Sequence, residues 1–350
     1  MNMNQYIIKE GASMLDALER LNLLSGKQMV LLVVDDSQVM TGTLTDGDVR
    51  RALLAGVSLS ATVKDAMHRN FKAIKGDEVD VKMMRNCRLA GIGVLPHLNA
   101  DGTIKNIYDL TITKAILPLS AILMAGGKGE RLRPLTLSTP KPLLEIGGKA
   151  IIDYNVEALA AVGISDITVS TRYLAEQLYE HFSTPVSGVN VKCITETLPL
   201  GTIGAASLVP RKKGGNTLVM NSDLLTTISF EEMYMRHIEE DADVTIAAIP
   251  YVVSVPYAIL TTNGANVEGI EEKPSYSYYA NAGIYIFSNE LLDTLPSDSR
   301  TDATDLIEQA ISAGKKVTYY PINGTWIDVG SPNDFKQAQE LMRHHNDLTK

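Results

Sequence analysis

From Leu119 to the C-terminus, short apolar runs alternate with stretches that have helical periodicity. This alternation is typical of repeated strand–helix units, so it predicts an α/β fold with a mostly parallel sheet and helices on both faces. Ligands of such sheets bind at the carboxyl ends of the strands. The expected strands are Ser120–Met124, Asp166–Thr171, Asn190–Ile194, Thr217–Met220, Asp243–Ile249, Tyr257–Thr261, Ala282–Phe287 and Lys316–Tyr320, and the expected helices are Ile151–Val162, Leu174–Phe182, Phe230–His237, Ala303–Ala313 and Pro332–His345.

The first 118 residues follow a different pattern, and the 350-residue chain is long enough for two domains. A boundary near Leu117–Pro118 fits a short proline-containing link between residues 1–118 and 119–350. The first part reads as two related copies, at about residues 1–60 and 61–118, each with a pair of strands joined by a turn. The expected strand pairs are Gln28–Val34 with Val39–Leu44 and, in a weaker second copy, Gly91–Leu95 with Thr103–Ile107.

Composition narrows the class of protein. The net charge of −9 argues against a nucleic-acid partner, which would favour a basic face. No apolar run is long enough to span a membrane, and the N-terminal residues lack the basic and apolar regions of a signal peptide. Cys87 and Cys193 are the only cysteines and imply neither a disulfide framework nor a zinc site. We therefore expect a cytoplasmic protein with no membrane partner.

A glycine-rich loop follows the first expected strand of the second domain. It reads Ala125-Gly126-Gly127-Lys128-Gly129, and Arg131 and Lys141 come shortly after it. Glycines let the backbone bend sharply and expose N–H donors, and two cations beside those donors make a site for a polyphosphate. The alternative is an ordinary turn with surface charges. The loop residues expected to bind a nucleotide are Ala125, Gly126, Gly127 and Gly129.

The whole string GGKGERLRPLTLSTPKPLL resembles the signature of the sugar-1-phosphate nucleotidyltransferases. The resemblance extends from about Leu119 to the C-terminus, with further matches at Glu196, Asp223, Glu272-Lys273-Pro274 and Trp326-Ile327-Asp328. It implies a Rossmann-like, mixed and mostly parallel sheet. It also implies attack by a sugar 1-phosphate on the α-phosphorus of a nucleoside triphosphate, with loss of pyrophosphate. The enzyme then has to neutralise charge and align reactants, and it needs no nucleophile of its own.

The resemblance assigns roles to four charged residues. The cation at the position of Arg131 steadies the departing phosphates, and Lys141, held between two prolines, places a fixed charge beside them. The family uses aspartates at the positions of Asp223 and Asp328 to hold Mg²⁺, which accepts two carboxylates and completes its octahedron with phosphates and waters. A strand-end aspartate alone is more often a cap or turn residue.

The sugar side of the site rests on two further matches. In Glu272-Lys273-Pro274 the family's glutamate grips sugar hydroxyls and its lysine meets the sugar phosphate, while Asn281 and Gly283 would line the sugar pocket. Some relatives have a glycine where this chain has the alanine of Tyr257-Ala258-Ile259, so the identity of the sugar stays open. The implied catalytic residues are Arg131, Lys141 and Lys273.

Glu196 bears on the choice of base. Thymidylyl- and many uridylyltransferases carry a glutamine there, which both donates and accepts hydrogen bonds, whereas a carboxylate only accepts. Guanine offers adjacent N1–H and N2–H donors, so Glu196 favours GTP. Two strings also resemble the guanylyltransferase branch, namely Glu196–Thr202 and Asn221-Ser222-Asp223. The resemblance implies that Glu196, Gly201, Thr202 and Asn221 bind the nucleotide. In the alternative, Glu196 points to solvent and backbone groups select the base.

The first domain resembles a tandem pair of CBS domains, small modules that often bind adenosine nucleotides. The resemblance rests on GTLTDGDVRR at residues 42–51, followed by VKDAM at residues 63–67. It implies that Thr45 and Asp48 hold phosphate and ribose hydroxyls. In the second copy Ile112 falls at the position of Asp48, and it cannot bind a diol. The alternative is that Asp48 only caps the following helix. CBS modules commonly pair face to face, so we expect a homo-oligomer.

The combination most resembles CBS-fused glucosamine-1-phosphate guanylyltransferases of legionaminic acid pathways. The sequence therefore predicts transfer of GMP from GTP to a sugar 1-phosphate with Mg²⁺ as cofactor. Mannose or heptose 1-phosphate as substrate, and a uridylyl- or thymidylyltransferase of the same fold, remain alternatives. A catalytically dead regulatory subunit that senses adenosine nucleotides is disfavoured because the charged site residues are all present.

Overall fold

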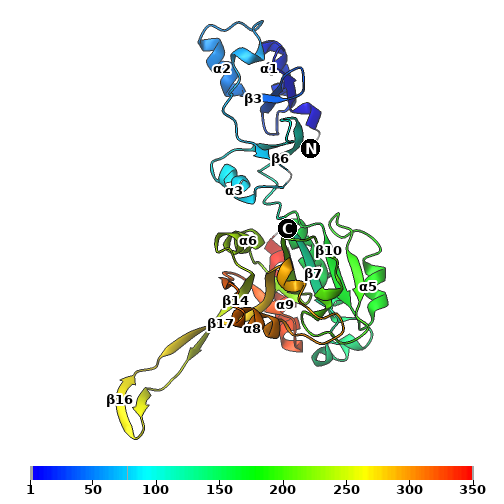
Figure 1. Cartoon of the computed structure of the whole chain (residues 1–350), viewed down its shortest axis with the longest axis vertical. Helices are drawn as coiled ribbons and strands as arrows, with labels where there is room; N and C mark the ends of the chain where they lie inside the picture. Colours follow the sequence, from blue (N-terminus) through cyan, green and yellow to red (C-terminus); the bar gives the residue numbers. More distant parts are fainter. Residues whose placement is uncertain (1–2, 77, 349–350) are drawn as a thin grey trace. The chain divides into compact units, whose positions relative to one another are not determined.

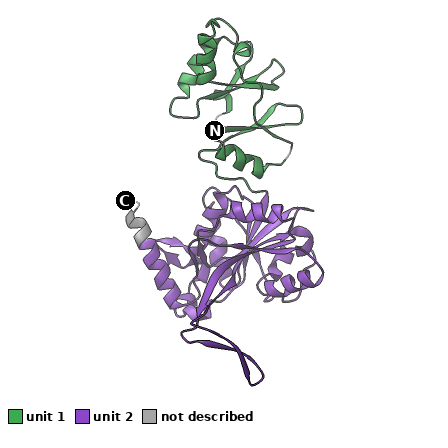
Figure 2. Cartoon of the chain, turned by 90° about the vertical axis from the view of Figure 1, so that its left-hand side faces the viewer, with its two compact units in different colours: residues 1–117 green, residues 118–350 purple. Residues whose placement is uncertain are grey.

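The computed structural model describes residues 3–76 and 78–348. The chain divides into two compact units, Met1–Leu117 and Pro118–Lys350, called unit 1 and unit 2 below (Figure 2). Each unit buries apolar side chains of its own, around Leu31 and Leu95 in unit 1 and around Ile122 and Ile151 in unit 2.

Unit 1 contains two three-stranded sheets of the same topology (Figure 1). In each sheet a short first strand lies parallel to the middle strand, and the middle strand is antiparallel to the third. The elements are β1 (Ile7–Lys9), α1 (Met14–Leu23), β2 (Val30–Val34), β3 (Met40–Thr45) and α2 (Asp46–Leu54), then β4 (Ile74–Lys75), α3 (Val81–Leu89), β5 (Val94–Leu98) and β6 (Ile104–Asp109). In the first half, helix α2 follows β3. In the second half, the turn Leu110–Ile112 follows β6 at the corresponding place.

Both strand pairs expected in unit 1 form, and the largest difference in bounds lies in the first strand of the second pair. The first strand of the second pair, β5, begins at Val94 and ends at Leu98, whereas the sequence predicts Gly91–Leu95. Gly91 has a φ of +75° and turns the chain after α3, so it cannot belong to the strand. The first hairpin turns at Asp35, whose Oδ1 accepts hydrogen bonds from the Ser37 and Val39 amides at 2.9 Å.

Unit 2 is built on a seven-stranded sheet in the order β11-β10-β7-β12-β17-β14-β18. Neighbouring strands are parallel except for β17, which runs antiparallel to both β12 and β14. This is the mostly parallel, mixed sheet that the sequence predicts. The strands are β7 (Leu119–Ala125), β10 (Ile167–Thr171), β11 (Lys192–Thr195), β12 (Asn216–Asn221), β14 (Val244–Ser254), β17 (Ser275–Ser288) and β18 (Val317–Pro321).

Helices at each expected position accompany this sheet, and two small antiparallel pairs flank it. The sheet residues Ile122, Val219 and Phe287 are buried in one cluster with Leu306 of α8, which shows how an amphipathic helix covers the sheet. The helices are α4 (Ile151–Ala160), α5 (Ala175–His181), α6 (Phe230–Glu239), α7 (Asn289–Leu292), α8 (Ala303–Ser312) and α9 (Pro332–Leu348), and the pairs are β8 (Glu145–Ile146) with β9 (Lys149–Ala150) and β13 (Leu224–Thr226) with β19 (Trp326–Asp328).

The expectation that Tyr257–Thr261 joins the main sheet is wrong. Strands β14 and β17 continue together beyond the sheet as a long hairpin, and β15 (Ile259–Asn263) pairs with β16 (Asn266–Glu271) at its far end (Figure 1). The run Tyr251-Val252-Val253 consists of aromatic and β-branched residues, which favour continuation of β14. We call residues 250–280 the arm.

None of the helices in residues 3–76 and 78–348 is long and apolar enough to cross a membrane.

Buried His237, in the last turn of α6, predicts a pH dependence of folding. Its side chain is 2% exposed and its Nδ1 lies 2.8 Å from Thr245 Oγ1. Burial lowers the pKa of His237 to about 4, although the nearby Asp243 and Asp241 charges act in the opposite direction. The unfolded chain binds this proton near the ordinary pKa of about 6.5, so the contribution to stability is complete above that pH and is lost as pH falls toward 4.

We expect this group alone to reduce the free energy of unfolding by about 2 kcal/mol between pH 7.5 and pH 5. Urea unfolding followed by the fluorescence of Trp326, the single tryptophan, measures this in unit 2. His237→Gln removes the titrating group, so its stability should fall less over the same interval. An equal decrease in both proteins would show that His237 is not responsible.

Candidate active site

The carboxyl ends of four parallel strands meet at one cavity of unit 2. Strand β7 lies between β10 and β12. The chain adds β10 and β11 on one side of β7 and then adds β12 on its other side, which makes the end of β7 a topological switch point. The cavity of about 430 Å³ lies there. Its lining residues are Met124, Gly126, Gly127, Lys128, Arg172, Glu196, Pro199, Gly201, Thr202, Asn221, Asp223 and Arg300.

The glycine loop needs glycine at two positions for steric reasons. A Cβ atom on Gly126 would lie 2.7 Å from Glu196 Oε1, closer than van der Waals contact allows. Gly129 has a φ of +60°, and a Cβ atom there would lie 2.9 Å from Thr136 Cγ2. Gly127 has open space around it, and Ala125 is buried at the end of β7. The loop therefore runs close against the residues that follow β11.

Glu196 is 6% exposed and lies in the cavity wall. Ser170 Oγ donates to Glu196 Oε1 at 3.1 Å, and the Leu200 amide donates to Oε2 at 3.3 Å. The alternative in which Glu196 points to solvent is therefore wrong. Because each carboxylate oxygen has two lone pairs, Glu196 can accept further hydrogen bonds from a ligand.

Gly201 and Thr202 are fixed against the start of α8. Gly201 has a φ of +84°, and a Cβ atom there would lie 2.4 Å from the Thr301 carbonyl oxygen. The Thr202 amide donates to Asp302 Oδ1 at 3.0 Å, and Thr202 Oγ1 accepts from the Ala303 amide at 2.8 Å. Although burial raises the pKa of Asp302, hydrogen bonds from Thr202 and Arg300 and the Arg300 charge hold it below its ordinary value.

A cluster of opposite charges forms where β13 pairs with β19. This pairing places Leu224 opposite Asp328 and so brings Asp223 next to Asp328. Lys141 Nζ donates to Asp223 Oδ2 and lies 3.5 Å from Asp328 Oδ1. Burial and the neighbouring Asp223 raise the pKa of Asp328, and the charges of Lys141 and Arg131 partly offset this. The structure thus brings together the four charged residues expected from sequence.

Two oxygens of this cluster suit a metal ion. Asp223 Oδ1 and Asp328 Oδ1 are buried and have no hydrogen-bond partner in the described residues. A buried polar atom without a partner is costly, and a divalent cation would satisfy both carboxylates. No group of three or more His, Cys, Asp or Glu side chains within residues 3–76 and 78–348 is arranged to hold a metal. The two carboxylate oxygens of Asp223 and Asp328 are a donor set that fits Mg²⁺, which takes few protein ligands and completes its shell with phosphates and water.

Asn221, Asn281 and Gly283 meet at the end of β12. Gly283 has a φ of +70°, and a Cβ atom there would lie 2.5 Å from Asn221 Nδ2. The Gly283 amide donates to Asn281 Oδ1 at 3.0 Å, and Asn281 Nδ2 donates to the Tyr285 hydroxyl at 2.9 Å. An irregularity in the pairing of β14 with β17 lies at this point. Such bulges often re-aim side chains beside active sites.

Glu272 and Lys273 lie elsewhere. Both are exposed and stand in the link between β16 and β17, at the far end of the paired part of the arm. Ser254, the last residue of β14 in that pairing, lies six residues beyond Ala248, or roughly 20 Å along a strand. The structure does not bring Glu272 and Lys273 to the cavity, so their role toward the sugar phosphate stays a prediction.

A family model described as nucleotidyl transferase matches residues 120–345. The chain belongs to the nucleotidyl transferase family. The match leaves residues 1–119 outside it.

The chain is similar to several mannose-1-phosphate guanyltransferase sequences. It is 32% identical over 226 residues to the mannose-1-phosphate guanyltransferase of Yarrowia lipolytica, with 62% of each chain covered. It is 31% identical over 245 residues to that of Saccharomyces cerevisiae, with 66% of each chain covered. The chain thus spans just under two thirds of the length of these relatives.

The crystal structure of HddC from Yersinia pseudotuberculosis has the same fold as unit 2. The TM-score is 0.50 and the identity 24%, with 63% of this chain and 98% of HddC covered.

Sequence reasoning missed three cations that line the cavity. Lys128 lies inside the glycine loop, and Arg172 directly follows β10, at the strand end where ligands of such sheets bind. These two positions carry a signal in the sequence. Arg300 precedes α8 and reaches the cavity only through the packing of its loop, so no local pattern predicts it.

In unit 1, Thr45 and Asp48 form the capping box at the start of α2. Asp48 Oδ2 accepts from the Thr45 amide and hydroxyl at 2.8 and 2.6 Å, and Arg51 donates to Oδ1 at 2.5 Å. Burial raises the pKa of Asp48. The hydrogen bonds from Thr45 and Arg51 and the charge of Arg51 outweigh burial and hold this pKa below its ordinary value. These contacts match the capping interpretation, and the role of Thr45 and Asp48 toward a nucleotide stays a prediction.

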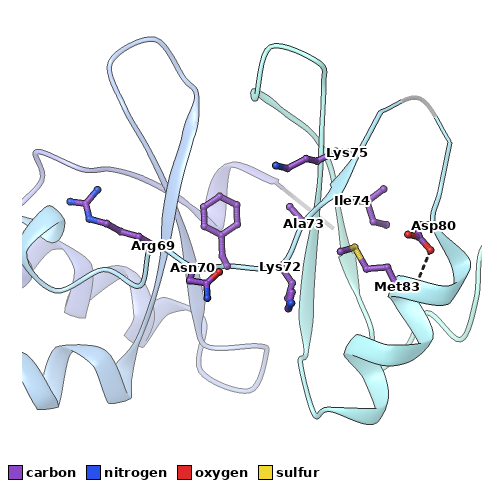
Figure 3. A pocket seen from close by; sticks show the side chains of 9 residues that line it. Arg69, Asn70, Lys72, Ala73, Ile74, Lys75, Asp80 and Met83 are labelled. Carbon is purple, nitrogen blue, oxygen red and sulfur yellow. Dashed lines mark hydrogen bonds between the residues drawn. The ribbon is translucent and has the colours of Figure 1, made fainter.

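A cavity of about 570 Å³ lies in unit 1 between its two sheets (Figure 3). Three basic residues, Arg69, Lys72 and Lys75, line it together with Phe71 and other residues of the segment that joins the two halves. Their side chains point in different directions (Figure 3).

The close packing of Gly126 against Glu196 predicts that alanine substitutions at Gly126 and Gly127 differ in their effect on stability. Gly126→Ala should reduce the free energy of unfolding by about 1–3 kcal/mol, because the new methyl group meets the buried Glu196 carboxylate. Gly127→Ala has open space and should leave stability unchanged or raise it by up to about 1 kcal/mol. Denaturant unfolding followed by Trp326 fluorescence compares them, and equal stabilities would contradict the close packing of Gly126.

Proposed function

We propose that the protein transfers GMP from GTP to a sugar 1-phosphate, giving a nucleotide-sugar and pyrophosphate. The observation that carries this proposal is a pair of buried oxygens beside Lys141, one on Asp223 and one on Asp328, that accept no hydrogen bond within the described residues. The cluster lies next to a glycine loop at the switch point of the sheet, where phosphates bind in folds of this kind.

The proposed reaction joins two anions, and the site is suited to reduce their repulsion. Arg131 and Lys141 supply fixed positive charge, and Lys128 and Arg172 add charge along the cavity wall. Exposed backbone amides of the glycine loop can donate to phosphate oxygens. Mg²⁺ held by Asp223 and Asp328 would supply further charge neutralisation when bound. The sugar phosphate itself is the nucleophile, so alignment and charge account for the chemistry.

Guanine is the proposed base for two reasons. The Glu196 carboxylate lies in the cavity wall with lone pairs left for the N1–H and N2–H donors of guanine. The relatives from Yarrowia lipolytica and Saccharomyces cerevisiae are named guanyltransferases. A uridylyl- or thymidylyltransferase remains the alternative, because the fold accommodates other bases.

For the sugar, the names of these relatives favour mannose 1-phosphate, while the fused CBS pattern favours glucosamine 1-phosphate. Heptose 1-phosphate is a third candidate. Asn281 and Gly283, beside Asn221, are the proposed contacts to the sugar. Glu272 and Lys273 are assigned to the sugar phosphate by their motif alone.

For unit 1 we retain the proposal of a tandem CBS pair that binds an adenosine nucleotide and contributes to a homo-oligomer. The repeated sheet topology supports it. The engagement of Asp48 by Thr45 and Arg51 argues that a nucleotide would have to compete with the helix cap.

Release of pyrophosphate tests the reaction. GTP, UTP, CTP, ATP and dTTP are each combined with glucosamine, N-acetylglucosamine, mannose, glucose or heptose 1-phosphate, with Mg²⁺ or EDTA and with or without AMP, ADP or ATP. We expect release with GTP and one sugar, and loss of it with EDTA. Release with UTP or dTTP alone would contradict the assignment of GTP as the substrate. If no pair released pyrophosphate, with or without adenosine nucleotides, the proposal of nucleotidyl transfer to a sugar 1-phosphate would be wrong.

Substitution of Glu196 tests the base assignment separately. Glu196→Gln keeps the size of the side chain but replaces an acceptor by a donor, so kcat/KM for GTP relative to UTP should fall by about 10–100-fold. Ser170→Ala is a matched control that removes only a neighbour of the carboxylate. An unchanged GTP/UTP ratio in Glu196→Gln would exclude this side chain as the determinant of the base.

A further inference from the structure

The carboxyl ends of four parallel strands are ordered across the cavity of unit 2. The sheet order β11-β10-β7-β12 gives the order Glu196, Arg172, glycine loop and Asp223 for the residues that follow these strands. Because neighbouring strands lie about 4.8 Å apart, Arg172 is one strand from Glu196 and two strands, or roughly 10 Å, from Asp223. Arg172 therefore lies at the Glu196 end of the cavity, away from the proposed metal ligands.

Strand register brings Arg172 to the same side of the sheet as the Glu196 carboxylate. Thr171 lies opposite Thr195, and the Glu196 amide donates to the Thr171 carbonyl oxygen at 2.8 Å. Side chains alternate between faces along a strand, so Arg172 follows the face of Ser170. Ser170 Oγ donates to Glu196 Oε1 at 3.1 Å, and both Arg172 and Glu196 line the cavity.

The guanidinium of Arg172 has no partner of its own. Within residues 3–76 and 78–348 its side chain makes no hydrogen bond or ion pair, although the Glu196 carboxylate lies in the same cavity. Its five N–H donors are therefore available to a ligand. The other two cations of the cavity differ, because Arg300 donates to Asp302 Oδ2 at 2.9 Å and Lys128 belongs to the glycine loop.

The two groups match two neighbouring edges of guanine. Guanine presents N1–H and N2–H donors on one edge and the acceptors O6 and N7 on the next. A carboxylate accepts from the first pair, and the planar fork of an arginine donates to the second pair. Glu196 Oε1 lies toward Ser170 of β10, and Oε2 lies toward the Leu200 amide. A guanine whose N1–H meets Oε1 turns O6 and N7 toward the strand that ends at Arg172.

Other bases suit the arginine less well. Adenine has an amino group in place of O6, so the guanidinium would face a donor. Uracil and thymine have no N7, so one of the two acceptors is missing. An arginine at this place would thus add discrimination against all three bases to the discrimination that Glu196 supplies.

We propose that Arg172 is a second determinant of the base and donates to O6 and N7 of the guanine that Glu196 holds by its other edge. This inference rests on the proposed function, because it requires GTP in this cavity. It gives a role to a cation that lies outside the motifs identified in the sequence.

The test removes an acceptor from the ligand and the guanidinium from the protein. Calorimetric titration with Mg²⁺ gives the Kd of GTP, of 7-deaza-GTP, which lacks N7, and of ITP, which lacks only the 2-amino group. We expect the wild-type chain to bind 7-deaza-GTP about 10-fold more weakly than GTP. Arg172→Ala should bind GTP about 10–100-fold more weakly and should bind 7-deaza-GTP equally well as GTP. Its preference for GTP over ITP, which depends on Glu196, should remain.

Arg300→Ala is the matched control, because it removes an arginine from the same cavity. It should keep the preference for GTP over 7-deaza-GTP, and melting temperatures verify that both variants are folded.

The inference is overturned if the wild-type chain binds GTP and 7-deaza-GTP equally, if Arg172→Ala keeps the preference, or if Arg300→Ala loses it as well. An equal loss of affinity for GTP and UTP in Arg172→Ala would assign the residue to the phosphates instead. Each of these results leaves the proposed function standing, whereas a wild-type chain that binds no GTP would contradict both.

Discussion

The ion cluster of Lys141 with Asp223 and Asp328 is the interaction on which the site of this protein depends. Two carboxylates held this close repel each other, and burial further disfavours the charged form of Asp328. Lys141 compensates for this by donating to Asp223 and lying near Asp328. The cation is held in a 3₁₀ turn, Lys141–Leu143, that begins directly after Pro140. Asp223 Oδ1 and Asp328 Oδ1 accept no hydrogen bond within the described residues, so both carboxylates have an oxygen left for a divalent metal.

The sheet determines where this cluster stands. Because β7 has β10 on one side and β12 on the other, the loops after these strands diverge and leave a crevice at their carboxyl ends. The glycine loop enters that crevice, and Gly126 lets it approach Glu196 closely. The carboxylate proposed to recognise the base and the aspartate proposed to hold the metal, Glu196 and Asp223, therefore lie in the same cavity although they come from distant parts of the chain.

The arm follows from the same sheet by a different physical rule. In the described part of the chain, β14 after Ala248 and β17 before Ile284 pair only with each other, so their outer edges are unpaired and apolar side chains on both faces are exposed. Free edges and exposed aromatic faces are surfaces that proteins normally cover. The family motif Glu272–Pro274 lies on this arm, so its position relative to the cavity depends on what holds the arm.

The sequence by itself determined the class of sheet, the positions of most strands and helices, and the glycine loop, because these depend on local periodicity and on backbone freedom within a few residues. It also identified Asp223, Asp328 and Lys141 through motifs. Only the tertiary structure decided that Glu196 turns inward, that Arg300 reaches the cavity, and that the arm leaves the sheet. Each of these depends on contacts between residues far apart in the chain, and no local pattern encodes such contacts.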